Sequence, residues 1–198
     1  MNHQTVFPHP CQDGGVRFKI TTSLLNATFV RVGRWGVNVP IQAIYSDLST
    51  EGLESVELTI DLVDGTLAPV TVTAVAAAGH AVDGTSLRDI PVHELATAAI
   101  GRFLLRCVDE EKGAFEPIEP LEFDADAIRS AGPTDESLRV VADIYEIARL
   151  MGDPPARQVE KTLNMPRTTA SKWIRRARER GILEANPVRP DLATPTQR

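Results

Sequence analysis

Apolar and polar residues alternate along much of the first 80 positions, which is the pattern of a β-strand with one buried face. The alternation is seen in VRFKI and over nine residues in SVELTIDLV, and the segment from Trp35 to Tyr45 is rich in β-forming residues around Pro40. LAPVTVTAVAAA follows the turn Asp64–Gly65. The pattern predicts a small antiparallel sheet of four or five strands, with Pro40 and Pro69 at edges or strand ends.

The spacing of apolar residues changes to that of an α-helix after a second predicted turn at Asp83–Gly84. Pro91 suits the first turn of a helix, where its missing N–H costs nothing. From Val92 to Leu104 the apolar residues then recur near helical spacing. We expect a helix over about 91–107 that covers one face of the sheet.

The remaining segments differ in composition, and the whole chain is expected to have an α+β fold. The small antiparallel β-rich N-terminal domain, with its one covering helix, is joined by an acidic, proline-containing linker to a C-terminal three-helix domain. The predicted segments are a flexible arm (1–14), the β-rich domain (15–108), the linker (109–133), the helical domain (134–183) and a flexible tail (184–198).

Three consecutive helices are predicted after the linker. Thr134 is a suitable N-cap for an amphipathic first helix that ends at Gly152. Asp153 is expected to cap a short second helix that has Pro154 and Pro155 in its first turn and ends near Leu163. After a tight turn over 164–166, the third helix runs from about Arg167 to Arg180, and Gly181 ends it. Three helices with a short turn before the last are the plan of a helix-turn-helix domain.

The apolar residues of the second and third helices are spaced as such a domain requires. The expected core of the motif is formed by Val159, Leu163, Met165, Ala170 and Trp173. This stretch, about 134–183, resembles the helix-turn-helix domains of bacterial transcription regulators, resolvase-type recombinases and transposases. It is most similar to actinobacterial and actinophage proteins in which a β-rich domain precedes the motif. These families usually have a small residue at the position of Glu160, so Glu160 must lie along the groove between the helices or hold them farther apart.

The distribution of charge supports a polyanionic partner. The chain has a net charge of -6, and residues 1–132 hold nine basic against 18 acidic residues. Residues 153–182, in contrast, hold eight basic and only three acidic residues. A compact basic segment on an acidic protein is typical of a module that binds nucleic-acid phosphates.

The resemblance and the helical spacing assign roles to the exposed side chains. The residues expected to read base edges in the major groove are Arg167, Thr168, Ser171, Lys172 and Arg175. The residues expected to hold phosphates are Lys161, Arg176, Arg178 and Arg180. Arg167→Ala should therefore relax sequence preference, whereas Arg178→Ala should weaken binding to all sequences. One such domain covers few base pairs, so a homodimer on double-stranded DNA with half-sites about 10 bp apart is expected.

Other chemistries find little support in the sequence. There is no membrane-length apolar run, no signal peptide, no phosphate-binding glycine loop and no hydrolase motif. His3, His9 and Cys11 lie in the expected arm without a metal-binding spacing, so neither a metal nor a cofactor is predicted. Tyr45 is the only tyrosine of the N-terminal half and lies inside a predicted strand, which argues against a recombinase. We expect a cytoplasmic, nucleoid-associated protein without enzyme activity.

Two functional interpretations remain open at this point. The first is a sequence-specific regulator of transcription whose domain 15–108 dimerises or binds a protein or small ligand. The second is an adaptor or interaction protein, for instance of a phage or mobile element, in which the acidic β-rich domain engages another protein. The helical domain would then serve only as a tether or a protein-docking surface. An accessory factor in recombination or chromosome segregation would share the DNA-binding chemistry of the first.

Overall fold

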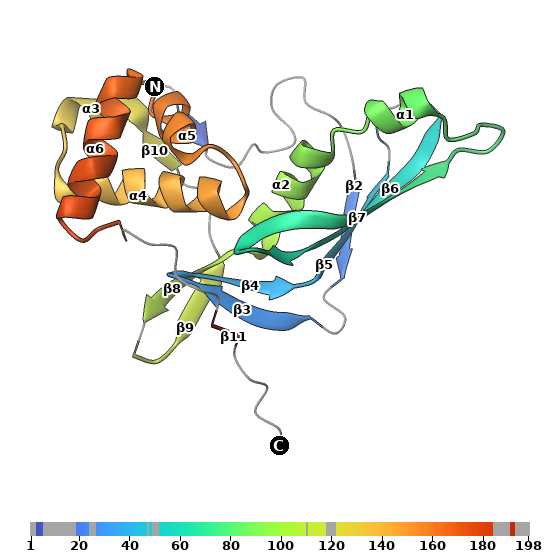
Figure 1. Ribbon diagram of the computed structural model, residues 1–198, viewed down its shortest axis with the longest axis horizontal. Helices are drawn as coiled ribbons and strands as arrows, with labels where there is room; N and C mark the ends of the chain where they lie inside the picture. Colours follow the sequence, from blue (N-terminus) through green and yellow to red (C-terminus); the bar gives the residue numbers. More distant parts are fainter. Residues whose placement is uncertain are drawn as a thin grey trace. The chain divides into compact units, whose positions relative to one another are not determined.

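The computed structural model divides the chain into two compact units, which are described separately (Figure 1). The helical unit comprises Met1–Val6 and Glu119–Val188, and the sheet unit comprises Phe7–Ile118 and Arg189–Arg198. The structure describes residues 3–5, 19–23, 27–46, 48, 52–109, 111–117, 122–183 and 191–192. Over these residues the fold is mixed α+β, with two antiparallel sheets in the sheet unit and six helices along the chain.

The first sheet of the sheet unit has four antiparallel strands in the order β2-β5-β6-β7. Their bounds are Lys19–Ser23 (β2), Ile41–Ser46 (β5), Leu53–Val63 (β6) and Thr66–Ala76 (β7). The predicted alternation produces its buried face, because Ile41, Ala43 and Tyr45 are all buried while the residues between them are exposed. Pro69 lies in β7, which is an edge strand among the described residues, as the sequence predicts.

A second antiparallel sheet has the strand order β11-β3-β4-β8-β9. Its strands are Asp191–Leu192 (β11), Thr28–Val32 (β3), Trp35–Val39 (β4), Leu105–Asp109 (β8) and Ala114–Pro117 (β9). The prediction of a single sheet is therefore wrong. The segment 35–45 is divided at Pro40, which follows a cis peptide bond and separates β4 from β5, two strands of different sheets. Strand alternation does not reveal which strands pair, because pairing depends on contacts between distant residues.

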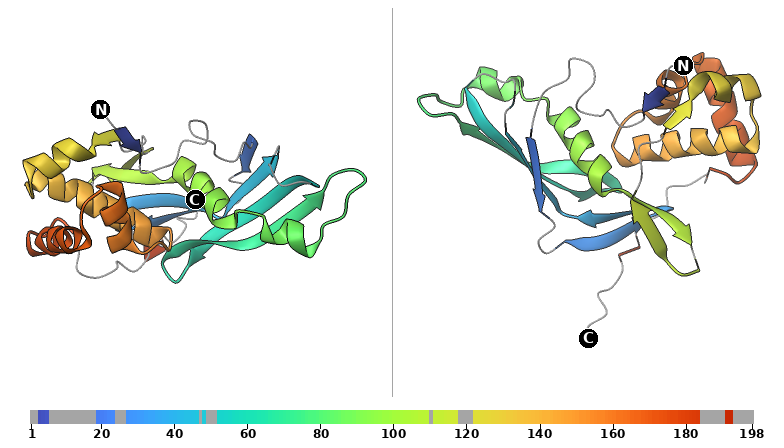
Figure 2. Two further views of the ribbon diagram at one scale, coloured as in Figure 1. Left: turned by 90° about the horizontal axis from the view of Figure 1, so that it is seen from above. Right: turned by 180° about the vertical axis from the view of Figure 1, so that it is seen from behind.

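Helix α2 (Val92–Phe103) covers the four-stranded sheet across β5, β6 and β7 (Figure 2). The hydroxyl of Tyr45 donates a hydrogen bond to the carbonyl of Leu95, with a distance of 2.5 Å between the oxygens. Burial raises the pKa of Tyr45 far above its usual value, so this hydroxyl stays protonated. The helix ends at Phe103 rather than near 107, because Leu104 is extended and the next residues form β8.

Helix α1 (Gly84–Arg88) occupies the position where only a turn was expected. The carboxylate of Asp83 accepts the backbone N–H groups of Thr85 and Ser86, and so caps this helix. These hydrogen bonds, first the one from Ser86, hold the pKa of Asp83 below its ordinary value. The sheet unit thus has two helices among its described residues instead of one.

The helical unit contains a short strand pair followed by four helices. Strand β1 (His3–Thr5) pairs antiparallel with β10 (Glu122–Asp124). The helices are Ala125–Ala131 (α3), Asp135–Leu150 (α4), Pro155–Thr162 (α5) and Arg167–Glu179 (α6). Their shared core includes Leu138, Val141 and Ile144 from α4, all at most 1% exposed.

The predicted acidic linker 109–133 differs from what the structure contains. It holds β9, β10 and α3, and Asp124 caps α3 by accepting the N–H groups of Asp126 and Ala127. Ala125 is buried in the core of the helical unit, and Ile128 packs against it. The sequence pattern did not reveal these strands and this helix, because the segment is acidic and only a few of its apolar residues pack into the core. Of the predicted arm and tail, the structure describes only the short strands β1 and β11; the rest lies outside the described residues.

Candidate nucleic-acid interface

Helix α6 has one face buried in the core of the helical unit. Ala170, Trp173, Ile174 and Ala177 are at most 7% exposed, and they follow the spacing i, i+3, i+4, i+7. The other expected core residues Val159, Leu163 and Met165 are also buried. The apolar positions of α5 and α6 therefore set which side of α6 is left to solvent.

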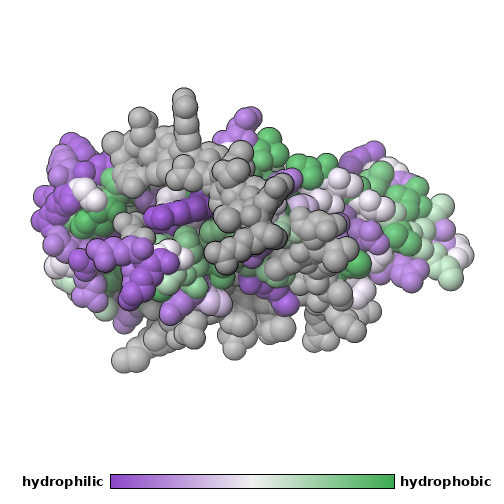
Figure 3. Space-filling model, turned by 90° about the horizontal axis from the view of Figure 1, so that it is seen from below, coloured by the Kyte–Doolittle hydropathy of each residue, from purple (hydrophilic) through white to green (hydrophobic). Residues whose placement is uncertain are grey.

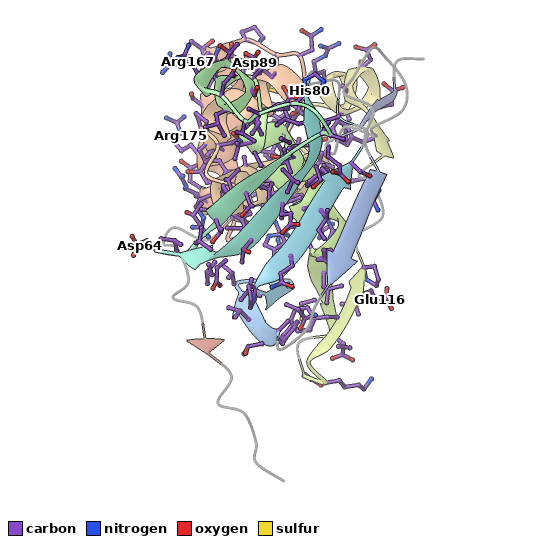
Figure 4. The ribbon with its side chains drawn as sticks, turned by 90° about the vertical axis from the view of Figure 1, so that its right-hand side faces the viewer. Asp64, His80, Asp89, Glu116, Arg167 and Arg175 are labelled. Atoms are coloured by element: carbon purple, nitrogen blue, oxygen red, sulfur yellow. The ribbon has the colours of Figure 1, made fainter. Side chains whose placement is uncertain are left out.

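The opposite face of α6 is exposed and basic. Thr168, Lys172 and Arg175 follow the spacing i, i+4, i+7, which places them on one face about half a turn from the buried residues. Arg167 and Ser171 are exposed on a flank of that face, so all five expected base-reading residues are accessible. Figure 4 shows Arg167 and Arg175 on the outer side of the helix. Within its 13 residues α6 carries five basic side chains and one acidic side chain.

The expected phosphate-binding residues divide into two pairs. Lys161 and Arg176 are exposed, and neither has a side-chain hydrogen bond or ion pair to a described residue. Arg178, in contrast, donates to the hydroxyl of Tyr145 at 2.8 Å, and its guanidinium lies 5.2 Å from the centre of the Tyr145 ring. Arg180 forms an ion pair with Asp135. Arg178 thus helps to hold α6 on α4, so Arg178→Ala would disturb packing, and Arg176 is the better probe of phosphate contact. The Arg180–Asp135 pair, with side chains 48% and 63% exposed, is screened by solvent and contributes little.

A weak ion pair also lies on the exposed face. The guanidinium of Arg175 is 3.4 Å from the carboxylate of Glu179, and these side chains are 70% and 61% exposed. An exposed pair of this kind contributes less than about 1 kcal/mol to stability, because water and salt screen it. It leaves Arg175 available to exchange this partner for another anion.

The turn between α5 and α6 is a helix C-terminal motif centred on Asn164. Its backbone is left-handed, with φ of 45°. The N–H of Met165 donates to the carbonyl of Glu160 at 3.1 Å, and the N–H of Asn164 donates to that of Lys161 at 3.2 Å. These two bonds satisfy carbonyls that the end of α5 would leave unpaired. The buried Met165 then fixes the direction in which the chain enters α6.

We predict that Asn164→Val lowers the free energy of unfolding of the helical unit by about 1–2 kcal/mol, because a β-branched residue is strained in the left-handed region. Asn164→Gly, which removes that strain, serves as the control and is expected to leave stability unchanged or slightly higher. Urea unfolding followed by circular dichroism measures both. Equal stabilities of the two variants would contradict the prediction.

Helix α3, which the sequence did not predict, contributes a further contact to this turn. Arg129 donates to the carbonyl oxygens of Asn164 at 2.5 Å and of Leu163 at 3.3 Å. It also forms an ion pair with Asp126 one turn earlier in α3. The local signals for this helix are its capping residues, Asp124 at the N-terminus and Gly132, with positive φ, at the C-terminus. Arg129 therefore supports the turn that leads into α6 from outside the three predicted helices.

We predict that Arg129→Ala lowers the free energy of unfolding by about 1–2 kcal/mol, because two carbonyls lose a charged donor. Arg139→Ala is the matched control: Arg139 is exposed on α4, and its loss is expected to change stability by less than about 0.5 kcal/mol. Chemical denaturation of both variants tests this. A loss no larger for Arg129 than for Arg139 would show that the contact does not support the turn.

Two details of α5 differ from the predictions. Pro154, not Asp153, is its N-cap residue, without a side-chain capping bond. Asp153 instead donates its N–H to the carbonyl of Ala148 at 2.8 Å, completing the end of α4, and its carboxylate accepts from Gln158 at 3.0 Å. Glu160, where the families that this stretch resembles usually have a small residue, is half-buried beside the fully buried Val159.

Two other kinds of functional feature are absent from the described part of the chain. Among those residues, no group of three or more His, Cys, Asp or Glu side chains is arranged to hold a metal ion. No helix there combines the length and apolar character that crossing a membrane requires. The side chains of His3, His9 and Cys11 lie outside the described residues. Comparison of the chain with protein-family models, curated proteins and solved structures found no match.

Proposed function

We propose that this protein binds double-stranded DNA in a sequence-specific manner and regulates transcription, with α5 and α6 acting as a helix-turn-helix. The observation that carries the proposal is the two-sided character of α6: one face is buried in the core, and the other is exposed and basic. An α-helix fits the major groove of DNA, where lysine and arginine reach guanine and where serine and threonine contact several bases.

The arrangement of groups supports distinct roles for the side chains. Lys172 and Arg175 occupy the middle of the exposed face, so they would meet base edges, with Thr168 beside them. Arg167 and Ser171 would read bases from the flank. Lys161 on α5 and Arg176 on α6 are exposed cations without a side-chain partner among the described residues, so they would hold phosphates on either side.

The distribution of charge also favours this orientation on DNA. The first 132 residues carry twice as many acidic as basic side chains, so they would be repelled by the phosphate backbone. Only the α5–α6 region concentrates positive charge. Because one such domain contacts few base pairs, the proposal includes a homodimer that places two copies of α6 on neighbouring half-sites about 10 bp apart.

The full-length protein should be used to select duplexes from a random-sequence pool, and the selected duplex should then be titrated at two salt concentrations beside a scrambled duplex. We expect the selected duplex to bind at least about 10³-fold more tightly than the scrambled one, with both affinities falling as salt rises. Equal binding of both duplexes would exclude a sequence-specific regulator. Absence of binding to any duplex at low salt would leave the adaptor interpretation.

A further inference from the structure

Strand β7 is an edge strand with an exposed outer side. It spans 11 residues, Thr66–Ala76, and among the described strands it pairs only with β6. An edge strand presents a row of backbone N–H and C=O groups that a further strand can pair with. Residues 70–73, in the middle of β7, are exposed in succession, so neither face of the strand is fully covered there.

The composition of β7 is unusual for an exposed edge. No Asp, Glu, Lys or Arg occurs from Gly65 to Val82, a run of 18 residues and the longest without these residues in the chain. Proteins commonly protect sheet edges with charged side chains, which prevent pairing with another strand. Pro69 and the register irregularity at Val70 both lie in the first half of the strand, and they leave residues 71–76 without such protection.

The apolar layer of the sheet also stops abruptly at β7. Val72 lies directly opposite Leu58 of β6, so the two side chains share a face. Leu58 is 2% exposed, whereas Val72 is 43% exposed because no described strand lies beyond it. Val75, opposite Ser55 on the other face of the sheet, is 36% exposed. Figure 3 shows hydrophobic side chains gathered towards the end of the sheet unit that carries α1.

We propose that β7 pairs antiparallel with β7 of a second copy of this chain, so that the two four-stranded sheets join across a two-fold axis. The choice of a second copy of the chain as the partner of β7 rests on the proposed function, which requires two copies of α6 on one DNA site. Charge does not oppose this self-pairing, because repulsion between two copies of a strand requires charged side chains on it. β7 has none, in a part of the chain that is otherwise strongly acidic.

Side chains on both faces of β7 suit this pairing. On the face shared with Leu58, Val72 would meet apolar side chains of the second strand and continue the layer that α2 covers. On the other face, Thr71 and Thr73 are exposed, and threonines in neighbouring strands pair favourably.

Sedimentation equilibrium of the full-length wild type and of Thr73→Lys tests the proposal. Thr73 lies opposite Glu57 in the β6–β7 register, so a lysine there has an acidic neighbour in its own chain and is compatible with the fold. In the dimer the substitution brings two lysines to the same interface. We expect the wild type to dimerise and the variant to dimerise at least about tenfold more weakly.

Gln42→Lys is the matched control, because it adds the same charge to an exposed position of the inner strand β5. It should dimerise like the wild type, and thermal unfolding should confirm that both variants are folded. If Thr73→Lys proves unstable, hydrogen exchange of the wild type provides the test: amides of β7 should exchange more slowly when the protein is concentrated enough to dimerise.

Three results would overturn the inference: a wild type that stays monomeric at about 100 μM, a dimer that Thr73→Lys leaves intact, or β7 amides whose exchange does not slow on dimerisation. Failure of the proposed function looks different. A protein that dimerises through β7 but binds no duplex DNA keeps this interface and loses the DNA-binding role. A monomer that selects a single half-site keeps the DNA-binding role and loses the interface.

Discussion

Replacing Lys172 and Arg175 together by alanine is expected to remove the preference of the protein for its selected duplex. Both side chains lie in the middle of the exposed face of α6, so neither replacement disturbs the buried face. A well-placed contact between such a side chain and a base contributes about 1–3 kcal/mol of discrimination. The double variant should therefore lose about 10²-fold to 10⁴-fold in the affinity ratio between selected and scrambled duplexes. Fluorescence anisotropy titrations with both duplexes measure this ratio.

Two control variants distinguish the loss of base contacts from the loss of a phosphate contact and from the loss of the ion pair on the exposed face. Arg176→Ala should lower the affinity for both duplexes equally and reduce the slope of log affinity against log salt by about one, because one phosphate contact is lost. Glu179→Ala removes the partner of Arg175 without removing a cation, so it should leave affinity equal or higher. If Arg176→Ala and the double variant reduce the affinity ratio equally, the division between base and phosphate contacts is wrong.

Trp173→Ala is expected to lower the free energy of unfolding of the helical unit by about 3–5 kcal/mol, which would leave it largely unfolded. The Trp173 side chain is 7% exposed and belongs to the core that joins α4, α5 and α6. The surrounding structure is expected to relax only partly into the vacated volume. Trp173→Phe, which retains most of that volume, should cost less and keep the unit folded.

The chain offers an internal reporter for this experiment. The chain has two tryptophans, and the other, Trp35, is 2% exposed in the sheet unit. In Trp173→Ala, tryptophan fluorescence therefore reports on the sheet unit, whereas helical circular dichroism reports mainly on the helical unit. We expect the helical signal to fall while the Trp35 emission stays that of a buried side chain. Loss of both signals together would show that the two units do not fold independently.

The sequence predicted the last three helices well because their ends are encoded locally. Gly152, Asn164 and Gly181 all have positive φ, and each lies directly after the end of one of these helices. Thr134 accepts the N–H of Ser137, as expected of an N-cap. A cap or a left-handed residue depends on only a few neighbours, so sequence reasoning can find it. The N-cap of α5 was predicted one position too early, at Asp153 instead of Pro154. Asp153 lies between the two helices, and its N–H completes the end of α4.

Elements stabilised by distant partners were predicted less well. Helix α3 has a single buried residue, Ala125, and its contacts to the α5–α6 turn come from Arg129, more than 30 positions away. Strand β8 was assigned to the end of a helix because its pairing with β4 and β9 is invisible in a local pattern. The two sheets were merged into one for the same reason.

The sequence alone therefore determined the alternation of the sheet strands, the helical periods and the concentration of basic side chains between residues 153 and 182, since these depend on the order of neighbouring residues. The tertiary structure decided which of those basic side chains are available. Arg178 donates to Tyr145 and Arg180 pairs with Asp135, both on α4, whereas Lys172 and Arg176 have no side-chain hydrogen bond or ion pair to a described residue. It also decided that β7 lies at a sheet edge. Side-chain partners and strand order both depend on contacts between residues far apart in the chain, and the spacing of residues along the sequence does not reveal them.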